Sequence, residues 1–498
     1  MKHLYGFFLL FLFHYSAAQR PASSRITPFA EAGLLAASAE RTPFWLRANQ
    51  FGIVPARSPA ATLRLGVFGS VALRDTQAST GRRPWTLTYR AEIVGNAGKQ
   101  STVLLPEAYV RVAHRSLELV AGRRREIIGL VDSTLSSGSF AWSGNALPMP
   151  KIRFGTAGFT PLWRNGWLGV NAFIAHGWFA DTWFMQHSFL HEKSTLWRLG
   201  KPAWGFRLYA GINHHAQWGG RSDYLDRNLA VDGQLPGRLR DFGNVFLTLI
   251  PRDRQNPRYT YFDGFNRFGN HLGSYDFGLE LPGKTTSLLF YHQHPYEDSS
   301  GLIFANLPDG LSGIRLQRRP AAGTGFRLNT LLLEVLLTRS QSGSFLDLYG
   351  LGTLRRTEGR DNYFNHSQYR EAWTYRGQVL GTPFITLQSD LRREWWNQSG
   401  WRIINNRVQV YHLGFRAAVG RRVEIEGRFS YSLNYGTYDQ ALPGSPGQFS
   451  SLLRATLPVR WLGGSVLTGA LALDQGRLYT NSAGTYLGLR KTWGRNSG

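Results

Sequence analysis

The sequence predicts an all-β fold, a transmembrane antiparallel outer-membrane β-barrel of about 18 strands, an even number as such barrels require. Three observations support this fold class. An export signal stands at the N-terminus, the predicted strands alternate in polarity over lengths that suit a tilted membrane strand, and the connections between them alternate between long and short.

Residues 1–18 have the layout of a secretory signal peptide. A basic start is followed by an apolar stretch from Leu4 to about Phe13 and by small residues up to Ala18, after which we expect cleavage. The alternative is a membrane anchor helix, but that needs about 20 apolar residues, and this stretch is shorter. We therefore expect residues 19–498 to form a single exported domain. The rest of the sequence offers no apolar run long enough for a spanning helix.

Alternating polarity dominates the mature chain. In residues 422–434, Val423 and Ile425 share one face, whereas the other face carries Glu426 and Arg428. A period of two over about ten residues is typical of a strand with one apolar and one polar face. Soluble sandwiches have shorter strands on average. Charges in the middle of such long strands therefore indicate a charged lumen and an apolar face turned to lipid.

The connections supply an independent test, because membrane barrels have short periplasmic turns and long extracellular loops. Counted back from the C-terminus, predicted short turns alternate with predicted long loops. The short turns are 282–283, 340–343, 420–421 and 462–464, and the main long loops are 39–60, 125–149, 293–325, 355–406 and 435–450. One stretch breaks the rule, because residues 219–241 are long where a short periplasmic turn is expected.

The chain is strongly basic, with 57 Lys and Arg against 32 Asp and Glu and a formal net charge of +25. In a cytoplasmic protein this charge would point to nucleic acid. An exported protein instead meets acidic polysaccharide and lipopolysaccharide, and arginine suits both because its planar guanidinium bonds carboxylates and phosphates in pairs. A genome rich in arginine codons is the alternative explanation.

Enzyme signatures are missing from the sequence. It contains no GxSxG elbow, HExxH helix, Walker loop or dinucleotide fingerprint, and without Cys it has neither disulfides nor thiolate ligands. His292 and His294 share a strand face, but a metal site would need further ligands. Glu424 and Glu426 lie between arginines, as in a charge ladder along a lumen. We therefore predict no catalytic residues, no cofactor and no metal.

Aromatic and hydrogen-bonding side chains gather in three of the predicted outer segments. Flat aromatic rings stack on the C–H faces of sugars, and Arg, Asn and Asp bond hydroxyls and carboxylates. The same side chains also suit loops that fold into the lumen as a plug, since Tyr and Trp have one apolar and one polar end. The residues predicted to bind polysaccharide are Trp45, Arg47 and Asn49 in the first segment, Trp142 and Asn145 in the second, and Asp361, Tyr363, Tyr369, Arg370, Trp373 and Tyr375 in the third.

Several stretches of the chain resemble one known family, the Wzi capsule-assembly outer-membrane proteins in the form found in Bacteroidetes. They are TPFWLRANQFGIVP (42–55), LSSGSFAWSGNALPMPKI (135–152), WGG (218–220), DNYFNHSQYREAWTYRGQVLGTP (361–383), NNRVQVYHLGF (405–415) and YSLNYGTYDQ (431–440). Together they span nearly the whole mature chain in one order. The sequence departs from the family pattern at Phe364, where Tyr is usual, and at Ala372, where Gly is usual.

The resemblance implies a barrel plugged by inward-folded loops, with minor helical elements near the periplasmic end. Such helices would account for the long stretch 219–241. The resemblance also implies a protein that holds capsular polysaccharide at the cell surface in a lectin-like way and is not an enzyme. It brings no catalytic residues with it.

The leading hypothesis is non-covalent binding of an acidic surface polysaccharide at the outer membrane of a Gram-negative bacterium. The expected partners are that polymer, outer-membrane lipid and lipopolysaccharide, and polysaccharide export machinery. An anion-selective porin is the alternative, because arginine rings in a lumen favour anions, although the length of loop 355–406 favours a plug. An outer-membrane hydrolase is a third hypothesis, which no motif supports.

Overall fold

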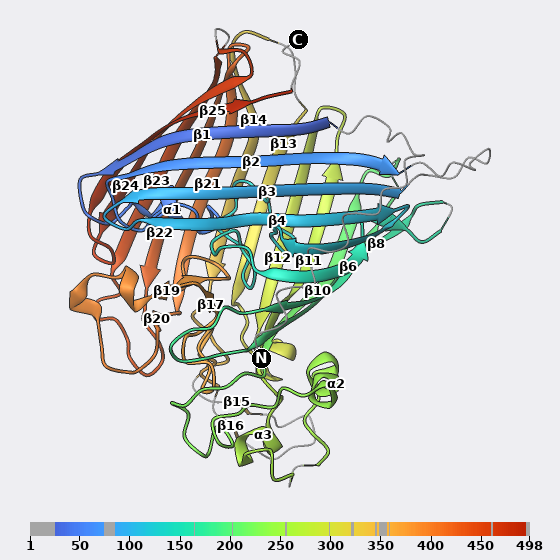
Figure 1. Cartoon of the computed structure of the whole chain (residues 1–498), viewed down its shortest axis with the longest axis vertical. Helices are drawn as coiled ribbons and strands as arrows, with labels where there is room; N and C mark the ends of the chain where they lie inside the picture. Colours follow the sequence, from blue (N-terminus) through green and yellow to red (C-terminus); the bar gives the residue numbers. More distant parts are fainter. Residues whose placement is uncertain are drawn as a thin grey trace, which may run out of the picture.

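The computed structural model describes residues 25–73, 85–163, 165–201, 203–253, 256–297, 299–319, 323–343, 346–347, 356–357, 359–459 and 462–494. The predicted signal peptide, residues 1–18, lies outside these ranges. A closed, strongly tilted sheet dominates the molecule, and long connections lie within it and extend beyond one of its ends (Figure 1).

Eighteen antiparallel strands close the barrel in the described residues, which confirms the predicted fold class. Wall strands that follow one another in the chain pair with one another, and pairing of β25 with β1 completes the circle. The short β7 (Thr160–Pro161) continues the line of β6, since both pair with β8. The wall strands are β1 (Arg25–Ala37), β2 (Ala60–Leu73), β3 (Trp85–Gly98), β4 (Thr102–His114), β5 (Leu117–Arg123), β6 (Pro150–Thr156), β8 (Leu168–Trp178), β9 (Phe189–Leu199), β10 (Arg207–Trp218), β11 (Asn270–Pro282), β12 (Thr286–Tyr296), β13 (Gly310–Arg318), β14 (Phe326–Leu337), β21 (Val408–Val419), β22 (Val423–Asn434), β23 (Gly447–Val459), β24 (Ser465–Gly476) and β25 (Ser482–Thr492).

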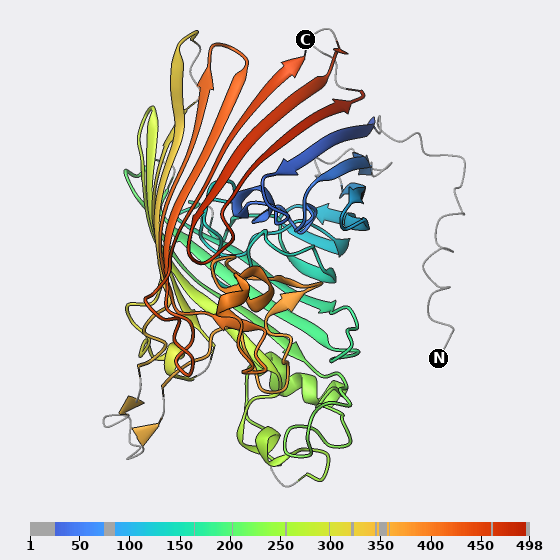
Figure 2. The same ribbon diagram turned by 90° about the vertical axis from the view of Figure 1, so that its left-hand side faces the viewer.

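Strand direction places the connections at two ends of the barrel. Short turns such as 115–116, 283–285 and 420–422 lie at one end, which we call the turn end, together with both termini of the described chain. The opposite end, which we call the loop end, carries the connections 38–59, 124–149, 219–269, 297–309, 338–407 and 435–446 (Figure 2). The β3–β4 connection at the loop end is short. In outer-membrane barrels the long loops face the cell exterior.

The alternation in the sequence becomes an inward and an outward face on each strand. On β24, Leu467, Leu471 and Leu473 are exposed on the outside, whereas Ala470 and Ala472 are buried against the interior. Exposed leucines and isoleucines continue around the neighbouring strands and form the apolar belt that meets lipid in a membrane barrel. Among the described helices, none is long and apolar enough to cross a bilayer.

Charged side chains take inward positions on the same wall. Glu426 of β22 lies 3.3 Å from Arg416, 3.1 Å from Arg428 and 3.3 Å from Arg454, so one carboxylate links three neighbouring strands. This arrangement agrees with the charge ladder predicted from the spacing of Glu424, Glu426 and the arginines around them.

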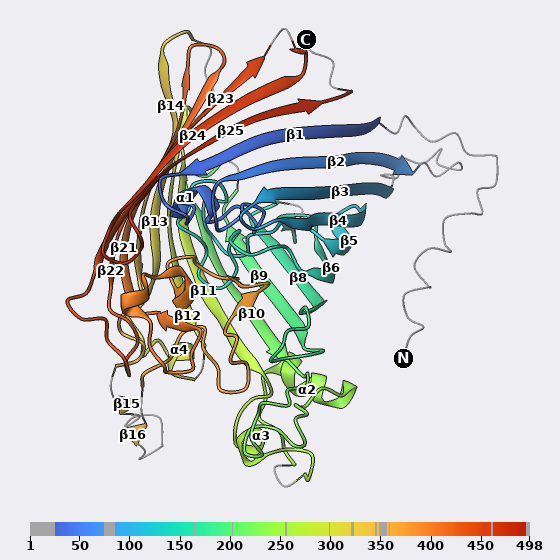
Figure 3. The ribbon, with the colours of Figure 1, turned by 60° about the vertical axis from the view of Figure 1, so that its left-hand side comes forward.

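Three connections fold into the lumen at the loop end, and we call residues 38–59, 124–149 and 359–407 the plug. Figure 3 shows α1 (Phe44–Arg47) of the plug inside the curve of the wall. Two large buried clusters combine plug residues with inward-facing wall residues. The small elements of the 338–407 connection are β17 (Thr374–Tyr375), β18 (Gln378–Val379), β19 (Thr386–Leu387), β20 (Ile403–Asn405), η1 (Gln388–Asp390) and η2 (Arg393–Trp395), which belong to the plug, and β15 (Leu346–Asp347), which pairs with β16 (Arg356–Thr357).

The helices lie at the opposite end from the predicted one. Residues 219–269 form one connection at the loop end that holds α2 (Leu239–Leu247) and α3 (Tyr261–Phe265), and α4 (Ser299–Leu302) lies at that end too. The predicted helical elements near the periplasmic end are therefore wrong, as is the periplasmic placement of 219–241. The exception arises because 219–269 contains no wall strand, so the stretch is a long outer loop like the others.

The predicted loop 293–325 also needs correction, because it contains the wall strand β13. The pattern of β13 is weak: Ser312 faces outward, where its hydroxyl meets His292 Nδ1 at 2.9 Å, and Gly313 contributes no side chain. The predicted short turn 340–343 lies instead within the long connection 338–407. The first error omits one strand, and the second implies one strand too many between 340–343 and 355–406. The predicted number of strands is therefore unchanged, and these two errors do not alter the predicted direction of strands outside 293–406.

Candidate functional site

Most residues that the sequence proposed as sugar contacts are buried within the plug. Eight of the eleven are buried and three are partly exposed. The buried ones are Trp45, Trp142, Asn145, Asp361, Tyr363, Tyr369, Trp373 and Tyr375, and the partly exposed ones are Arg47, Asn49 and Arg370. The burial of the aromatic residues favours their role as plug packing over direct contact with a polymer outside the cell.

The aromatic residues of segment 361–375 use their polar ends to bind other connections. Tyr363 donates its hydroxyl hydrogen to Asp309 at 3.0 Å, and Tyr369 donates to the carbonyl of Gly219 at 3.0 Å. The indole of Trp373 donates to the carbonyl of Ala141 at 2.8 Å. Burial raises the pKa of both tyrosines well above its usual value, which keeps their phenols neutral donors.

The segment around α1 is fixed in the same way. Trp45 is fully buried and donates its indole hydrogen to Ser430 Oγ of β22 at 3.1 Å. Arg47 lies 3.4 Å from Asp390 of η1, which Arg41 also contacts. Burial alone would raise the pKa of Asp390, but the two guanidinium groups outweigh it and hold this pKa below its usual value.

The second predicted segment, around Trp142 and Asn145, contacts both of the others, because Asn145 accepts from the Asn49 amide and Trp142 packs on Trp373. Trp142 stacks on the His215 ring at 5.3 Å between centroids, and Lys151 Nζ lies 4.6 Å from the indole centre. Asn145 Nδ2 donates to the carbonyl of Val379 at 3.0 Å. Asn49 Nδ2 and the backbone of 136–137 make a further link between the plug connections.

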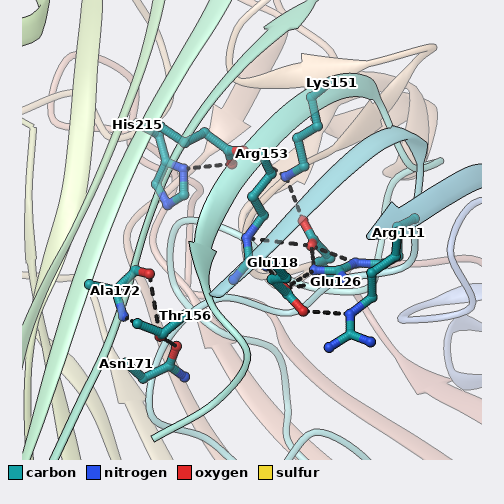
Figure 4. A network of polar contacts seen from close by, with 11 residues as sticks. Arg111, Glu118, Glu126, Lys151, Arg153, Thr156, Asn171, Ala172 and His215 are labelled. Atoms are coloured by element: carbon teal, nitrogen blue, oxygen red, sulfur yellow. Dashed lines mark hydrogen bonds and ion pairs between the residues drawn. The ribbon is translucent and has the colours of Figure 1, made fainter. Parts of the chain in front are cut away.

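An ionic network fastens the start of the 124–149 connection to the wall, as Figure 4 shows. Lys151 Nζ lies 2.7 Å from Glu126 and 2.6 Å from Glu192, and Arg111 Nε lies 2.6 Å from Glu118. Burial would raise the pKa of Glu126, but Lys151, Arg124 and Arg153 lower it to about 2. These charges are neutralised by one another, so the network is a structural fastening of the plug.

Outside the plug, three connections meet around a cavity at the loop end, which we call the outer pocket. It has a volume of about 300 Å³. The connections that form it are 179–188, 219–269 and 338–407. Its lining residues are Trp183, Phe184, Tyr224, Leu225, Asp226, Leu229, Arg370, Glu371, Gly400 and Arg402.

Two exposed aromatic rings form one side of the outer pocket. Trp183 and Tyr224 are each 64% exposed, and their ring centroids lie 5.1 Å apart at an interplanar angle of 71°. Phe184 lies beneath them, buried and stacked on Tyr224 at 6.0 Å. Large rings held by a buried neighbour and open to solvent give a ligand apolar faces at little cost in side-chain freedom.

Charged groups form the other side. Arg402 Nη2 lies 3.2 Å from Glu371 Oε1, and the Thr182 hydroxyl donates to the other carboxylate oxygen of Glu371. The Arg370 guanidinium lies over the Trp401 ring at 4.6 Å from its centre and donates through Nε to the Ser367 carbonyl at 3.0 Å. Both arginines therefore have a fixed orientation and remain partly exposed.

The outer pocket contains one residue that the sequence proposed, Arg370, and several that it did not. Trp183 and Tyr224 lie in the short stretches DTWFMQ and RSDYLDR, which carry no pattern that separates them from plug aromatics. A narrow cavity of about 40 Å³ adjoins the outer pocket through Glu371 and Arg402 and reaches Tyr369 and Tyr375. These two predicted residues thus line a cavity that adjoins the outer pocket and do not line the pocket itself.

Metal binding has no geometric support in the part of the chain that the structure describes, where no three His, Asp or Glu side chains gather suitably for an ion. The His292–His294 pair is used in other ways. His292 meets Ser312, and the His294 ring stacks on Phe304 at 4.4 Å.

The comparisons with known proteins support the fold. The chain is similar to a solved structure described as Wzi, an outer membrane protein involved in group 1 capsule assembly in Escherichia coli and a carbohydrate binding beta-barrel. The two share 16% sequence identity and a TM-score of 0.56, over 93% of this chain and 83% of that one. At this identity the likeness shows the fold alone, which is the part of the predicted resemblance that is confirmed.

Other solved barrels resemble the chain less. Acinetobacter baumannii OccAB2 shares 8% identity at a TM-score of 0.47, and the outer membrane protein OpdK of Pseudomonas aeruginosa shares 7% at 0.46. Each comparison covers 94% of this chain and 98% of the other. No protein-family model matches the sequence, and no curated protein matches it either.

Proposed function

We propose that this protein binds a surface polysaccharide at the outer membrane of a Gram-negative bacterium and retains the polymer there non-covalently, as a lectin does. The observation that carries the proposal is the outer pocket. Exposed aromatic faces stand opposite two oriented arginines at the end of the barrel that carries the long loops. The likeness in fold to a barrel described as carbohydrate binding supports it.

The pocket offers what an acidic sugar needs. Trp183 and Tyr224 present rings to the C–H face of a pyranose, while Arg370 and Arg402 present donors to a carboxylate. Glu371 accepts from sugar hydroxyls. A few polar groups that converge beside apolar faces are the usual composition of a binding site for a small ligand unit.

Binding of the purified protein to polysaccharide from its own host tests the proposal directly. Trp183→Ala and Tyr224→Ala should each weaken binding by about tenfold, because aromatic anchors in a pocket contribute on the order of 1–2 kcal/mol or more. Trp396→Ala is the matched control, since Trp396 is a 45% exposed Trp of the 338–407 connection, which also contributes to the pocket, but Trp396 itself does not line it. Equal effects of all three substitutions would contradict the proposed site.

A deletion strain tests the role in the cell. Loss of the gene should release polymer into the medium while synthesis continues, and the wild-type gene, but not Trp183→Ala, should restore retention. Polymer that stays bound to cells of the deletion strain would refute the anchoring function. The binding measured with the purified protein is a separate test and would not be affected by this result.

A porin, the alternative function, differs in its conductance. Plug residues cross the lumen to bind the wall, as when the Ser137 amide donates to Glu334 of β14 at 2.6 Å. In planar bilayers the protein should therefore show little current. Steady anion-selective conductance from the wild-type protein would favour the porin over the polysaccharide anchor.

A further inference from the structure

The outward face of the wall carries polar side chains near the loop end, at positions that would otherwise meet lipid. On β8, Ile174 and Trp178 are exposed on the outside of the barrel. His176 lies between them at the same alternation, so it also points outward. By the same alternation, His191 of β9 and His214 of β10 also point outward. Imidazole groups are costly against hydrocarbon unless they are covered or bonded.

The helix α2 covers these side chains. The Phe242 ring lies 5.2 Å from His191 and 5.3 Å from Trp218, and Phe246 lies 5.2 Å from His191. Lys193, which also points outward from β9, donates to the Phe246 carbonyl in the last turn of the helix. A cation at this end complements the helix dipole. One face of α2 is thus fixed to the outside of the barrel, beside the loop ends of β8 to β11 (Figure 1).

Four apolar side chains on and just after α2 are exposed, and we call them the stripe. Leu239 is 88% exposed and lies beside Phe242 and Phe246 on the helix, Leu247 is 61% exposed and lies beside Arg240 and Asn244, and Leu249 and Ile250 follow the helix. A helix that faced only water would place polar side chains there. The helix that carries the stripe lies on the outward face of the wall, because Phe242 packs on the outward-facing His176 and His191.

The surroundings of the stripe are basic. Arg238, Arg240 and Arg252 are all exposed around it, against one exposed acid nearby, Asp253. Asp241 belongs to the fixed face, where it is buried and accepts from the Tyr259 hydroxyl at 2.8 Å. A helix with an apolar stripe and flanking arginines suits the boundary between headgroups and acyl chains of an anionic membrane surface.

We propose that α2 is an interfacial anchor in the outer leaflet of the membrane. Its leucines lie among the upper acyl chains, and its arginines contact the phosphates of anionic lipid. The partner is a lipid surface, because the stripe belongs to a helix that packs on the lipid-facing side of the barrel wall and is flanked by arginines. The anchor fixes the height of the 219–269 connection above the membrane, and with it Tyr224 of the outer pocket. It does not depend on which polymer that pocket binds.

The natural chain lacks cysteine, so single labels can test the position of the helix. Leu239→Cys and Leu247→Cys carry an environment-sensitive fluorophore in nanodiscs of phosphatidylcholine mixed equally with phosphatidylglycerol. Leu471→Cys, mid-strand on β24 and 64% exposed to lipid, is the embedded control, and Asp223→Cys is the aqueous control in the same connection. Lipids with spin labels high on the acyl chain should quench both α2 labels at least half as strongly as the Leu471 label. Quenching of the α2 labels by aqueous iodide, at the level of the Asp223 label, would overturn the anchor.

The arginine contacts have their own readout. Spin-labelled phosphatidylglycerol should quench the Leu247 label about twofold more than spin-labelled phosphatidylcholine, because each arginine near the surface favours anionic lipid. Arg240→Gln combined with Arg252→Gln should remove this preference and leave the quenching by phosphatidylcholine unchanged. Equal quenching by both lipids in the protein with its native arginines would overturn the phosphate contact.

Discussion

Replacement of Trp373 by alanine separates the two roles that aromatic residues can have in this protein. Trp373 is fully buried in the plug, packs against Trp142 at 6.2 Å between ring centroids and donates its indole hydrogen to Ala141. Truncation of a buried Trp to Ala costs about 3–5 kcal/mol, and the Ala141 carbonyl also loses its donor. A cost of about 4 kcal/mol raises the opening constant of this part of the plug roughly a thousandfold.

Hydrogen exchange measured by mass spectrometry on protein in detergent reports that opening. The amide of Trp373 donates to the Phe364 carbonyl at 2.8 Å, and the amide of Thr382 donates to the Phe140 carbonyl at 2.9 Å. Both amides should exchange about a thousandfold faster in Trp373→Ala, whereas amides of the wall strands should keep their rates. The exposed Trp183, replaced by Ala, is the matched control, and there the exchange of segment 361–384 should stay within about twofold of wild type.

The same two variants also give the result that would refute this reasoning. If Trp373→Ala lost polysaccharide binding but kept the wild-type exchange rates in 361–384, the indole would act on the ligand and not on the plug. The outer pocket would then be the wrong site. The expected result is faster exchange in Trp373→Ala, and loss of binding with unchanged exchange in Trp183→Ala. Packing of the plug and recognition of the ligand would then belong to different residues.

Three further substitutions or conditions have expected outcomes. Asp390 has a folded-state pKa below its usual value, so its ion pairs stabilise the plug above the unfolded pKa of about 4 and lose this effect as pH falls through the lower folded-state pKa. Because the intrinsic exchange of amides is itself slower in acid, the quantity to measure is the protection factor, and protection factors in 41–47 should fall as pH falls below about 4. Ala372 has a positive φ of 64°, a backbone conformation that costs a non-glycine residue about 1–2 kcal/mol. Glycine avoids this cost but loses more conformational entropy on folding, so Ala372→Gly should stabilise the plug by a net of roughly 0.5–1 kcal/mol. Hydrogen exchange in 361–384 measures the change. Tyr369→Phe removes the bond to Gly219 that links the plug to the outer pocket and should weaken polysaccharide affinity about fivefold, for a loss of about 1 kcal/mol. Tyr363→Phe, whose hydroxyl bonds elsewhere, is its control and should leave the affinity unchanged.

The wall of the barrel could be predicted from the sequence because its signal is local. Period-two alternation needs only neighbouring residues, and each strand repeats it, so errors at single strands do not change the architecture. The signal failed where the outward face is not apolar. β13 was missed since Ser312 occupies an outward position and its inward neighbour Gly313 contributes no side chain. Residues 219–241 were assigned to the wrong end because the 219–269 connection contains no wall strand.

The candidate site was harder to predict because burial decides it. Trp373 and Trp183 are the same residue type in loops of similar composition, yet the first is fully buried and the second 64% exposed. The difference depends on which connections cover which, and these connections are distant in sequence. Resemblance to a family drew attention to 361–383, the stretch with the most recognisable aromatic residues, and the structure places those aromatics in the packing of the plug.

In the proposed function, the recognisable stretch 361–383 contributes to binding by holding the connections that carry the outer pocket. Segment 361–375 holds Tyr369, whose hydroxyl bonds the Gly219 carbonyl at the start of the connection that carries Tyr224. The same segment contains Glu371, which lines the outer pocket and pairs with Arg402. A buried aromatic framework of this kind limits the freedom of the loops above it, and pre-ordered loops lose less entropy when a ligand binds. In the proposed function, the recognisable stretch therefore contributes Arg370 and Glu371 to the outer pocket directly, while its buried aromatic residues fix the connections that carry the remaining pocket side chains.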